Sequence, residues 1–371
     1  MRTVEAGGLS IGPGHPPRIM GVLNLSEESP YSPSVFRDPV DAAEYVDRTL
    51  IAEGADIIDI GLESANKRFD VRSADWELDR LDRAFETIDH VDGEAVFSIE
   101  TRYHEVAEAA LEGPFDMVND ICGFADPEMP AVCQGFDAAV VKMASPPDLD
   151  RPGAVDTVDE IFDALARGDL TEKTIIDPAF GGWSETKTLE DDRDTFRRLR
   201  EFRVLDRPIL VSINRKNFLR KLVDRSTEEA LPVSLAATSM AVERGADVIR
   251  THDVAETRDA ALIGHAFSRK RPTSERVVPF DFSSIAEARR VVNRLGLDPS
   301  IVNESVGQSI LLTQLRDEER AVLDEAAQAA GLEFDVCQAG VFIRGRPDAF
   351  SRFAGSLDGS LSDIRDSLQQ E

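Results

Sequence analysis

The sequence lacks several features that would assign it to large classes of protein. No run approaches the roughly eighteen uninterrupted apolar residues that a membrane helix needs. The N-terminus, MRTVEAGGLS, has no apolar core of a signal peptide. The three cysteines, Cys122, Cys133 and Cys337, show no metal-type spacing. We therefore expect a soluble, cytoplasmic protein that contacts no membrane and whose cysteines are small buried hydrophobes.

Positive charge is scarce, and lysine is scarcer still. The chain has 42 basic and 70 acidic residues, which gives a formal net charge of -28 at pH 7, and only seven of the basic residues are lysines. Such a surface repels nucleic acid. One dense acidic tract would favour a basic partner, but the acidic residues are dispersed. The composition therefore indicates a surface adapted to high salt, where screening weakens self-repulsion.

Short apolar runs alternate with longer amphipathic segments over the first 265 residues, as in parallel strands connected by covering helices. The predicted strands are 18–24, 55–61, 95–100, 116–120, 138–143, 174–177, 208–213 and 246–250. The predicted helices are 39–53, 76–90, 105–112, 158–166, 189–202, 226–244 and 255–267. Eight such strands predict an α/β fold, a TIM (β/α)8 barrel of about 250 residues. An open doubly wound sheet is the alternative, but no glycine-rich dinucleotide fingerprint follows the first strand.

A polar, proline-containing stretch, residues 268–276 (SRKRPTSER), resembles a linker. Beyond it we expect strands at 276–282, 309–315, 333–336 and 340–344, and helices at 284–295, 317–330 and from Pro347 onward. The predicted domains are therefore a barrel over residues 1–270 and a smaller C-terminal α+β domain over residues 276–371. That appendage carries no recognisable catalytic cluster, so we expect it to stabilise the protein or form an interface.

Polar residues collect where the predicted strands end, which is where βα barrels place their active sites. They are Asn24, Glu100, Asn119, Asp120, Asp177, Asn214 to Asn217, Arg250 and His252. Any one asparagine or aspartate could be there only for a local turn or helix cap. Their number around one rim instead predicts an active site for a small anionic substrate.

The residue types suggest two halves of that site. Arg250 and His252, with Asn24 nearby, are suited to an oxyanion or a pyrophosphate, and Mg²⁺ could bridge Asn24 and the phosphates. Glu100, Asn119 and Asp177 are suited to reading a pterin or similar heterocycle through paired hydrogen bonds. Lys216 is a candidate as well, since lysine is rare in this chain.

Seven blocks of sequence, in order, resemble the dihydropteroate synthases, a family of pterin-binding barrels. They are IMGVLNLSEESPYS (19–32), GADIIDIGLES (54–64), FSIET (97–101), VNDICG (118–123), DPAFGG (177–182), NRKNF (214–218) and IRTHDV (249–254). The resemblance covers Ile19 to about His265.

The resemblance implies condensation of a dihydropterin methyl pyrophosphate with p-aminobenzoate, releasing pyrophosphate in folate biosynthesis. By position it implies that Asn24, Arg250 and His252 hold metal and pyrophosphate, with Asn24 as the metal ligand. Glu100, Asn119, Asp177 and Lys216 would hold the pterin, and Lys216, Arg250 and His252 would be catalytic. The family is commonly dimeric, so the resemblance also implies a homodimer.

The sequence departs from the family pattern mainly in the loops. Glu100 replaces an aspartate, Glu27, Glu28 and Pro30 alter the first loop, and Ala65 to Lys67 replace threonine-arginine-proline in the second. Asn214 replaces a serine, and Met143 is followed by Ala144 rather than histidine. Two alternatives stay open: a related pterin-dependent transferase with another acceptor, including methyl transfer to a corrinoid, or a non-catalytic pterin-binding paralogue.

Overall fold

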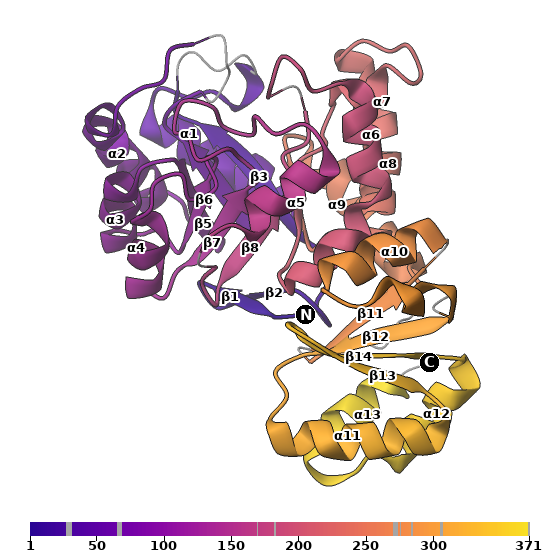
Figure 1. Cartoon of the computed structure of the whole chain (residues 1–371). Helices are drawn as coiled ribbons and strands as arrows, with labels where there is room; N and C mark the ends of the chain where they lie inside the picture. Colours follow the sequence, from indigo (N-terminus) through magenta and orange to yellow (C-terminus); the bar gives the residue numbers. More distant parts are fainter. Residues whose placement is uncertain are drawn as a thin grey trace. The chain divides into compact units, whose positions relative to one another are not determined.

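The computed structural model of the chain describes residues 1–26, 32–64, 69–168, 170–181, 183–269, 274, 276–282, 285–304 and 307–369 (Figure 1). The chain forms two compact units. The larger contains Val4–Arg200 and Pro208–Ser268, and the smaller contains Met1–Thr3, Glu201–Arg207 and Arg269–Glu371. Within the described ranges, no helix combines the length and the apolar character needed to cross a membrane.

The larger unit contains eight parallel strands in the order β8-β7-β6-β5-β4-β3-β10-β9. The strands are β3 (Arg18–Asn24), β4 (Ile57–Gly61), β5 (Val96–Thr101), β6 (Met117–Asp120), β7 (Ala139–Met143), β8 (Thr174–Asp177), β9 (Leu210–Val211) and β10 (Val248–Thr251). A parallel bridge between Ile176 and Ile209 joins the two ends of the sheet, and Ile176 N donates to Pro208 O at 2.9 Å. The predicted TIM barrel is confirmed.

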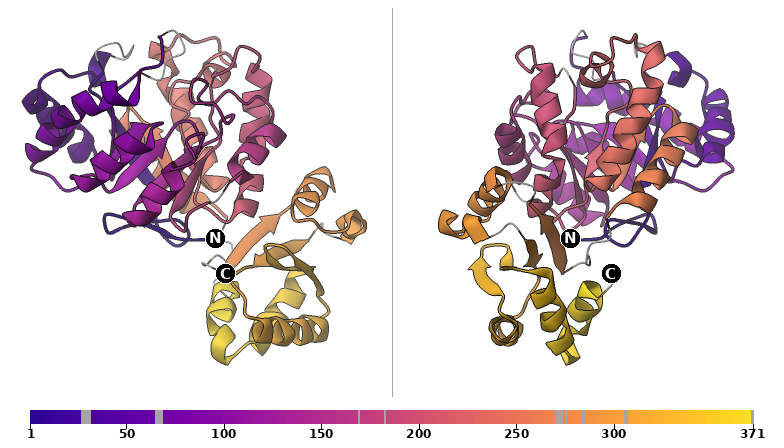
Figure 2. Two further views of the ribbon diagram at one scale, coloured as in Figure 1. Left: turned by 60° about the vertical axis from the view of Figure 1, so that its left-hand side comes forward. Right: turned by 90° about the vertical axis from the view of Figure 1, so that its right-hand side faces the viewer.

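Helices surround these strands in both views of Figure 2. They are α1 (Pro39–Tyr45), α2 (Ala74–Asp89), α3 (His104–Glu112), α4 (Met129–Gly135), α5 (Val158–Ala166), α6 (Leu189–Arg197), α7 (Asn217–Arg220), α8 (Leu231–Glu243) and α9 (Val254–Phe267). The predicted helix at 39–53 is α1 continued by a π-helical segment, η2 (Val46–Ile51). The predicted helix at 189–202 is α6 followed by a 3-10 segment, η3 (Leu199–Leu205). The short helices α4 and α7 were not predicted.

An antiparallel hairpin of β1 (Val4–Ala6) and β2 (Leu9–Ile11) precedes the barrel and was not predicted either. Its buried side chains Val4, Ala6 and Ile11 share one apolar cluster with residues near the amino ends of the barrel strands, such as Met20 and Ile57. The hairpin therefore packs at the amino ends of the strands, and the polar residues lie at the opposite, carboxyl ends.

The smaller unit is an α+β fold, as predicted. Its antiparallel strands, in the order β11-β12-β14-β13, are β11 (Val277–Asp281), β12 (Gln308–Leu312), β14 (Gly340–Gly345) and β13 (Glu333–Cys337). Its helices are α10 (Ile285–Arg294), α11 (Asp317–Ala330), α12 (Pro347–Ser356) and α13 (Ser362–Leu368). Side chains of α11, α12 and α13, among them Leu323, Phe353 and Ile364, share a core with sheet residues such as Ile310.

Two further expectations, on the cysteines and on the linker, are compared with the structure here. Cys122 and Cys133 are buried as expected, but the expectation was wrong for Cys337, which is only partly buried on the edge strand β13. Of the predicted linker, residues 270–273 and 275 lie outside the described residues. The segment Glu201–Arg207 is held in the smaller unit by Glu201, whose carboxylate lies 2.8 Å from Arg290 Nε.

Helices α8 and α9 pack closely at Gly264. A Cβ atom added to Gly264 would lie 2.5 Å from Ser239 O and 2.8 Å from Ser239 Cα. Both of these are backbone atoms, so no side-chain rotation can relieve the overlap. On the neighbouring turn Ser239 Oγ donates to Ala260 O at 2.6 Å, which fixes the same contact.

Gly264→Ala should therefore lower the free energy of unfolding of the barrel by about 1–3 kcal/mol. Thermal unfolding followed by tryptophan fluorescence measures this directly, because both tryptophans, Trp76 and Trp183, lie in the barrel unit. Gly135→Ala, where nothing lies within 4 Å of the added atom, is the matched control and should be neutral or slightly stabilising. Equal effects of the two substitutions would contradict this account of the α8–α9 contact.

Candidate active site at the carboxyl ends of the barrel strands

An arginine and two carboxylates form an ion-pair cluster at the carboxyl ends of the strands. Arg250 Nε on β10 donates to Asp59 Oδ2 on β4 at 2.7 Å, and Arg250 NH2 donates to Glu100 Oε2 on β5 at 2.5 Å. Asn119 Nδ2 on β6 donates to the same Asp59 oxygen at 3.0 Å. Four strands thus contribute side chains to one hydrogen-bonded cluster.

Because the cluster is buried, each charged group in it is stabilised mainly by the opposite charges of the other groups. Asp59 is fully buried, and its Oδ1 has no hydrogen-bond partner among the described residues. Burial raises the pKa of Glu100, and the Arg250 charge opposes that rise. Burial lowers the pKa of Arg250, but Glu100 and Asp59 together raise it above its ordinary value. Arg250 therefore stays charged and compensates two carboxylates that are costly to bury alone.

A second acid and base stand beside the cluster. Asp177, at the end of β8, accepts a hydrogen bond from Ala179 N at 2.8 Å, and burial raises its pKa to about 6. Lys216 immediately precedes α7, and its Nζ lies 5.5 Å from the centroid of the Trp183 ring. Burial lowers the pKa of Lys216, while Asp177 opposes the shift. A Cβ on Gly181, whose φ is +116°, would lie 3.1 Å from Lys216 Nζ, so a glycine suits this position.

These side chains line one small cavity. It is bounded by Glu100, Asn119, Ile121, Met143, Asp177, Ala179, Phe180, Trp183, Ser212, Lys216 and Arg250, and its volume is about 30 Å³. That volume has room for water but not for a bicyclic heterocycle. As it stands, this cavity therefore holds water, and Arg250 is one of the side chains that bound it.

A serine, Ser34, lies between Asn24 and His252 and contacts both side chains. Asn24 Nδ2, at the end of β3, donates to Ser34 Oγ at 2.8 Å, and Ser34 Oγ lies 3.4 Å from His252 Nδ1. Burial, reinforced by the Arg250 charge, lowers the pKa of His252 from 6.5 to about 3. His252 is therefore a neutral imidazole at neutral pH, with one ring N–H donor and one acceptor.

Hydrogen bonds fasten the loop after β9 to Asp253, the residue that precedes α9. Arg215 donates from Nε to Asp253 Oδ2 and from NH2 to Asp253 Oδ1, both at 2.8 Å, and Asn214 Nδ2 donates to Asp253 Oδ2 at 2.8 Å. Arg215 NH1 also donates to the carbonyl oxygens of Thr227 and Glu228. Asn214 and Arg215 therefore position the loop that carries Lys216.

The structure brings Glu100, Asn119, Asp177, Lys216 and Arg250 to one cavity, and it places Asn24 near His252. Asp120, also noted at the rim, instead caps a turn, because its carboxylate accepts hydrogen bonds from the backbone of residues 122–124. The altered loop positions Glu27, Glu28, Pro30 and Ala65 to Lys67, and Gly182 of the DPAFGG block, lie outside the described residues.

Two members of the site were not predicted, namely Asp59 and Ser34. Asp59 had a signal in the sequence: it is a single carboxylate within the buried strand IIDIG, and buried carboxylates need a partner. Ser34 had none, because it lies in a short 3-10 segment, η1 (Ser32–Ser34), that is too short to carry a pattern.

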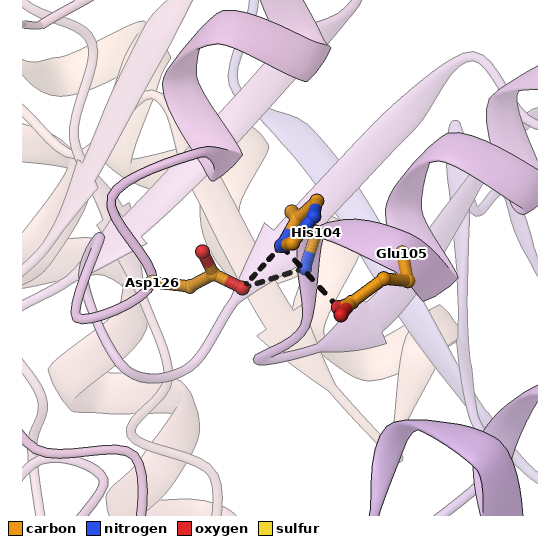
Figure 3. A group of neighbouring side chains, drawn as sticks. All are labelled: His104, Glu105 and Asp126. Carbon is orange, nitrogen blue, oxygen red and sulfur yellow. Dashed lines mark hydrogen bonds and ion pairs between the residues drawn. The ribbon is translucent and has the colours of Figure 1, made fainter.

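A histidine and two carboxylates gather at the start of α3 (Figure 3). Asp126 Oδ2 accepts hydrogen bonds from His104 N at 2.9 Å and from His104 Nδ1 at 2.8 Å, and Glu105 Oε2 lies 3.3 Å from His104 Nδ1. The hydrogen bond to Asp126 raises the pKa of His104. Since Asp126 Oδ1 also accepts from Glu128 N, capping of the backbone accounts for the arrangement, and we assign it no metal.

Comparison with known proteins identifies the family of this chain. Residues 20–252 match the family model described as pterin binding enzyme. That match covers more than half of the chain. The chain belongs to the pterin-binding enzyme family.

Individual relatives of this family member share its barrel. A probable bifunctional folylpolyglutamate synthase/dihydropteroate synthase from Halobacterium salinarum is 34% identical over 260 residues, covering 67% of this chain and 31% of that protein. The chain therefore spans about a third of the length of that relative. A dihydropteroate synthase from Synechocystis sp. is 31% identical, covering 68% of this chain and 90% of that protein. The Thermus thermophilus dihydropteroate synthase, whose structure is known in complex with 4-aminobenzoate, is 30% identical in sequence to this chain. The two structures match with a TM-score of 0.59, and the match covers 72% of this chain and all of that one.

A buried carboxyl of this pterin-binding barrel, that of Glu77, has a pKa raised above neutrality. Glu77, in the first turn of α2, is 1% exposed and accepts a hydrogen bond from Thr101 Oγ1 at 2.7 Å. Burial raises its pKa from 4.5 to about 8, although the Thr101 hydrogen bond opposes the shift. Because the folded-state pKa is the higher one, the protonated carboxyl contributes stability below pH 4.5. That contribution is lost as the pH rises through 8.

Glu77→Gln should remove this dependence, because the amide oxygen still accepts from Thr101 but cannot ionise. We expect the Tm of the variant minus that of the wild type to rise steadily from pH 5 to pH 9 and to be positive at pH 9. Thermal unfolding at each pH measures the difference. Glu86→Gln, an exposed position on the same helix, should track the wild type, and a flat difference for Glu77→Gln would show that Glu77 does not titrate in this range.

Proposed function

We propose that the chain is a dihydropteroate synthase that condenses 6-hydroxymethyl-7,8-dihydropterin pyrophosphate with p-aminobenzoate and releases pyrophosphate. The observation that carries the proposal is the cavity shared by Glu100, Asn119, Asp177 and Lys216 in a barrel of the pterin-binding family. The likeness to a dihydropteroate synthase that binds 4-aminobenzoate supports the same reaction.

The cavity residues suit the donor and acceptor pattern of a pterin. Asp177 and Glu100 supply carboxylate oxygens for ring and amino N–H groups, Asn119 supplies an amide, and Lys216 donates to a ring acceptor. Arg250 exchanges its present partners for the substrate as the pterin enters. A planar guanidinium can stack on the heterocycle or donate to the phosphates, so either new position compensates the lost ion pairs in part.

The chemistry follows from departure of the pyrophosphate. The methylene C–O bond breaks, its electron pair leaves with the pyrophosphate, and a cation forms that is delocalised into the pterin. The arylamine nitrogen then forms the C–N bond and loses one proton. Arg250 and neutral His252 donate to the departing phosphate oxygens, and Asn24 lies beside them. Asp177 and Glu100 favour the cationic pterin electrostatically.

We place Mg²⁺ beside Asn24, in the part of the site proposed to bind the pyrophosphate. Asn24 directs its amide nitrogen to Ser34, so its carbonyl oxygen is the end that suits a hard cation. Magnesium takes few protein ligands and keeps its waters, and one amide oxygen with substrate phosphates meets that requirement. When bound, the ion would neutralise charge on the leaving group.

We also propose a cellular environment and an oligomeric state for the enzyme. We infer that it works in a salt-rich cytoplasm, since the acidic residues are dispersed over a chain of net charge -28. We infer a homodimer from the resemblance to a family that is commonly dimeric. An acceptor other than p-aminobenzoate is the second candidate. The residues that favour it are those that replace the family's second loop, Ala65 to Lys67.

Pure protein with the dihydropterin pyrophosphate, Mg²⁺ and p-aminobenzoate at high salt should release pyrophosphate and form dihydropteroate. Chelation of Mg²⁺ should stop the reaction. Arg250→Ala should lower kcat by about 10²-fold or more, because it removes a charge-assisted donor to the leaving group. The same gene should restore growth to a strain that lacks dihydropteroate synthase, and the Arg250 variant should not.

Arg197→Ala is the matched control, because Arg197 pairs with Glu190 on the exposed face of α6, and it should leave kcat unchanged. Pyrophosphate release with a different arylamine alone would identify the second candidate. Tight pterin binding without turnover of any acceptor would indicate a non-catalytic paralogue.

Salt should stabilise the folded protein. Raising KCl from about 0.1 M to 1 M shortens the Debye length from about 10 Å to 3 Å and so weakens repulsion among surface carboxylates. We expect the Tm to rise by several degrees, at about 2–4 °C for each kcal/mol. Choline chloride at equal ionic strength should reproduce the gain, whereas equal osmolality of sucrose should give less. A Tm that falls with KCl would exclude a salt-adapted surface.

A further inference from the structure

The turn that follows β8 contains two residues with left-handed backbone conformations. They are Ala179, with a φ of +57°, and Gly181, with a φ of +116°. Glycine takes such a φ readily, but a residue with a Cβ atom takes it only where its surroundings hold it there. Since Ala179 lines the small cavity beside Asp177, the contacts that hold this turn also set the shape of that cavity.

A buried lysine and a buried aspartate hydrogen-bond to the backbone of this turn. Lys187 Nζ donates to Ala179 O at 2.8 Å and lies 3.2 Å from Asp192 Oδ1. The same aspartate oxygen accepts a hydrogen bond from Gly181 N at 3.1 Å. The side chain of Lys187 is 0% exposed and that of Asp192 is 4% exposed. One ion pair therefore binds the backbone of both left-handed residues.

Local structure accounts for neither member of this ion pair. Lysine is rare in this chain and is seldom fully buried in any protein. Asp192 lies in the first turn of α6, but Thr188 and Asp191 already form the capping box of that helix. A buried ion pair also adds little net stability compared with apolar side chains of the same volume. What the Lys187–Asp192 pair does supply is a fixed position for the two backbone groups that it binds.

The turn contacts two residues of the candidate site. Ala179 N donates to Asp177 Oδ1 at 2.8 Å. A Cβ atom on Gly181 would lie 3.1 Å from Lys216 Nζ, so the backbone of the turn passes close to that amine. Displacement of the turn would therefore move the hydrogen-bond donor of Asp177 and loosen the packing against Lys216.

We propose that Lys187 and Asp192 are positioning residues that hold residues 177–181 in the conformation that binds the pterin. They act through the backbone of Ala179 and Gly181 and touch no substrate. The inference rests on the proposed function for the identity of the ligand, but the order of the turn can be measured without any ligand. Loss of the pair should loosen the turn and, as a consequence, weaken pterin binding.

Fluorescence of Trp183 measures the order of the turn. Trp183 Nε1 donates to Phe180 O at 3.1 Å, and Trp76→Phe leaves Trp183 as the only tryptophan of the chain. In this background, Lys187→Met and the double variant Lys187→Met/Asp192→Asn should each raise the acrylamide-quenching constant of Trp183 by about 2-fold or more. The double variant leaves no unpaired buried charge, so it is the variant expected to fold best.

Lys173→Met is the matched control. Lys173 Nζ donates to Asp137 O at 2.7 Å and lies 2.8 Å from Asp137 Oδ2, and Asp137 also has a positive φ, of +53°. Asp137 precedes β7 and Lys173 precedes β8, so this pair lies at the amino ends of the strands, away from the candidate site. Its loss should leave the quenching constant of Trp183 unchanged.

Calorimetric titration with 6-hydroxymethylpterin, which has a pterin ring and no leaving group, tests the consequence for the site. At a temperature where circular dichroism shows each protein folded, both Lys187 variants should bind this ligand about 10-fold more weakly than the wild type, and Lys173→Met should bind it as the wild type does. In turnover, the KM for the dihydropterin pyrophosphate should rise by more than kcat falls, because the pair touches no reacting atom. Wild-type affinity in both Lys187 variants would overturn the proposal, as would a looser turn with unchanged affinity.

Hydrogen exchange of the wild type needs no variant. The Gly181 amide, which donates to Asp192, should exchange about 100-fold or more slowly than the same amide in an unstructured peptide. Exchange at the unstructured rate would refute the hold on the turn even if neither Lys187 variant folded.

The two proposals fail in different ways. Lys187-dependent binding of 6-hydroxymethylpterin without pyrophosphate release would support the positioning role and reject the proposed reaction. Normal pterin binding and turnover in both Lys187 variants would support the reaction and reject the positioning role.

Discussion

The ion pairs of Arg250 with Asp59 and Glu100 are the constraint on which the rest of the site depends. Two largely buried carboxylates at the carboxyl ends of neighbouring strands would be strongly destabilising without a cation. The arginine supplies that cation from β10, on the other side of β3 in the sheet order. Its presence lets two carboxylates lie at the carboxyl ends of the barrel strands.

The same ion pairs explain why the cavity is small. While Arg250 contacts Glu100, the space among Glu100, Asn119, Asp177 and Lys216 is about 30 Å³. A ligand therefore competes with an internal ion pair, and the net binding energy is the difference between the two. Ring nitrogens and amino groups that replace the guanidinium donors keep that difference favourable, while an apolar ligand of equal size would leave the carboxylates unpaired. In the proposed reaction, selectivity for a polar heterocycle would follow from the cost of separating Arg250 from its partners.

The sequence predicted elements whose signals are local. Strand β3 was predicted with its observed bounds because RIMGVLN is a buried run ended by a polar residue. The β1–β2 hairpin was missed because its three-residue strands carry too little pattern, and its burial comes from the barrel strands that it packs against. The rim residues were predictable because strand ends share one edge. The pairing of Arg250 with Asp59 was not, since Asp59 lies 191 residues away in sequence and only the pairing of β10 with β3 brings the two near each other.

An acidic surface repels the anionic substrates of the proposed reaction, and salt screens that repulsion. The proposed substrates, dihydropterin pyrophosphate and p-aminobenzoate, are both anions, and a chain of net charge -28 repels them over a Debye length of about 10 Å at 0.1 M salt. At 1 M that length falls to about 3 Å, which removes the long-range repulsion. The pairs Arg250–Glu100 and Arg102–Glu63 are largely buried and are screened much less. High salt would therefore suppress the field that repels the proposed substrates and leave these buried ion pairs in place.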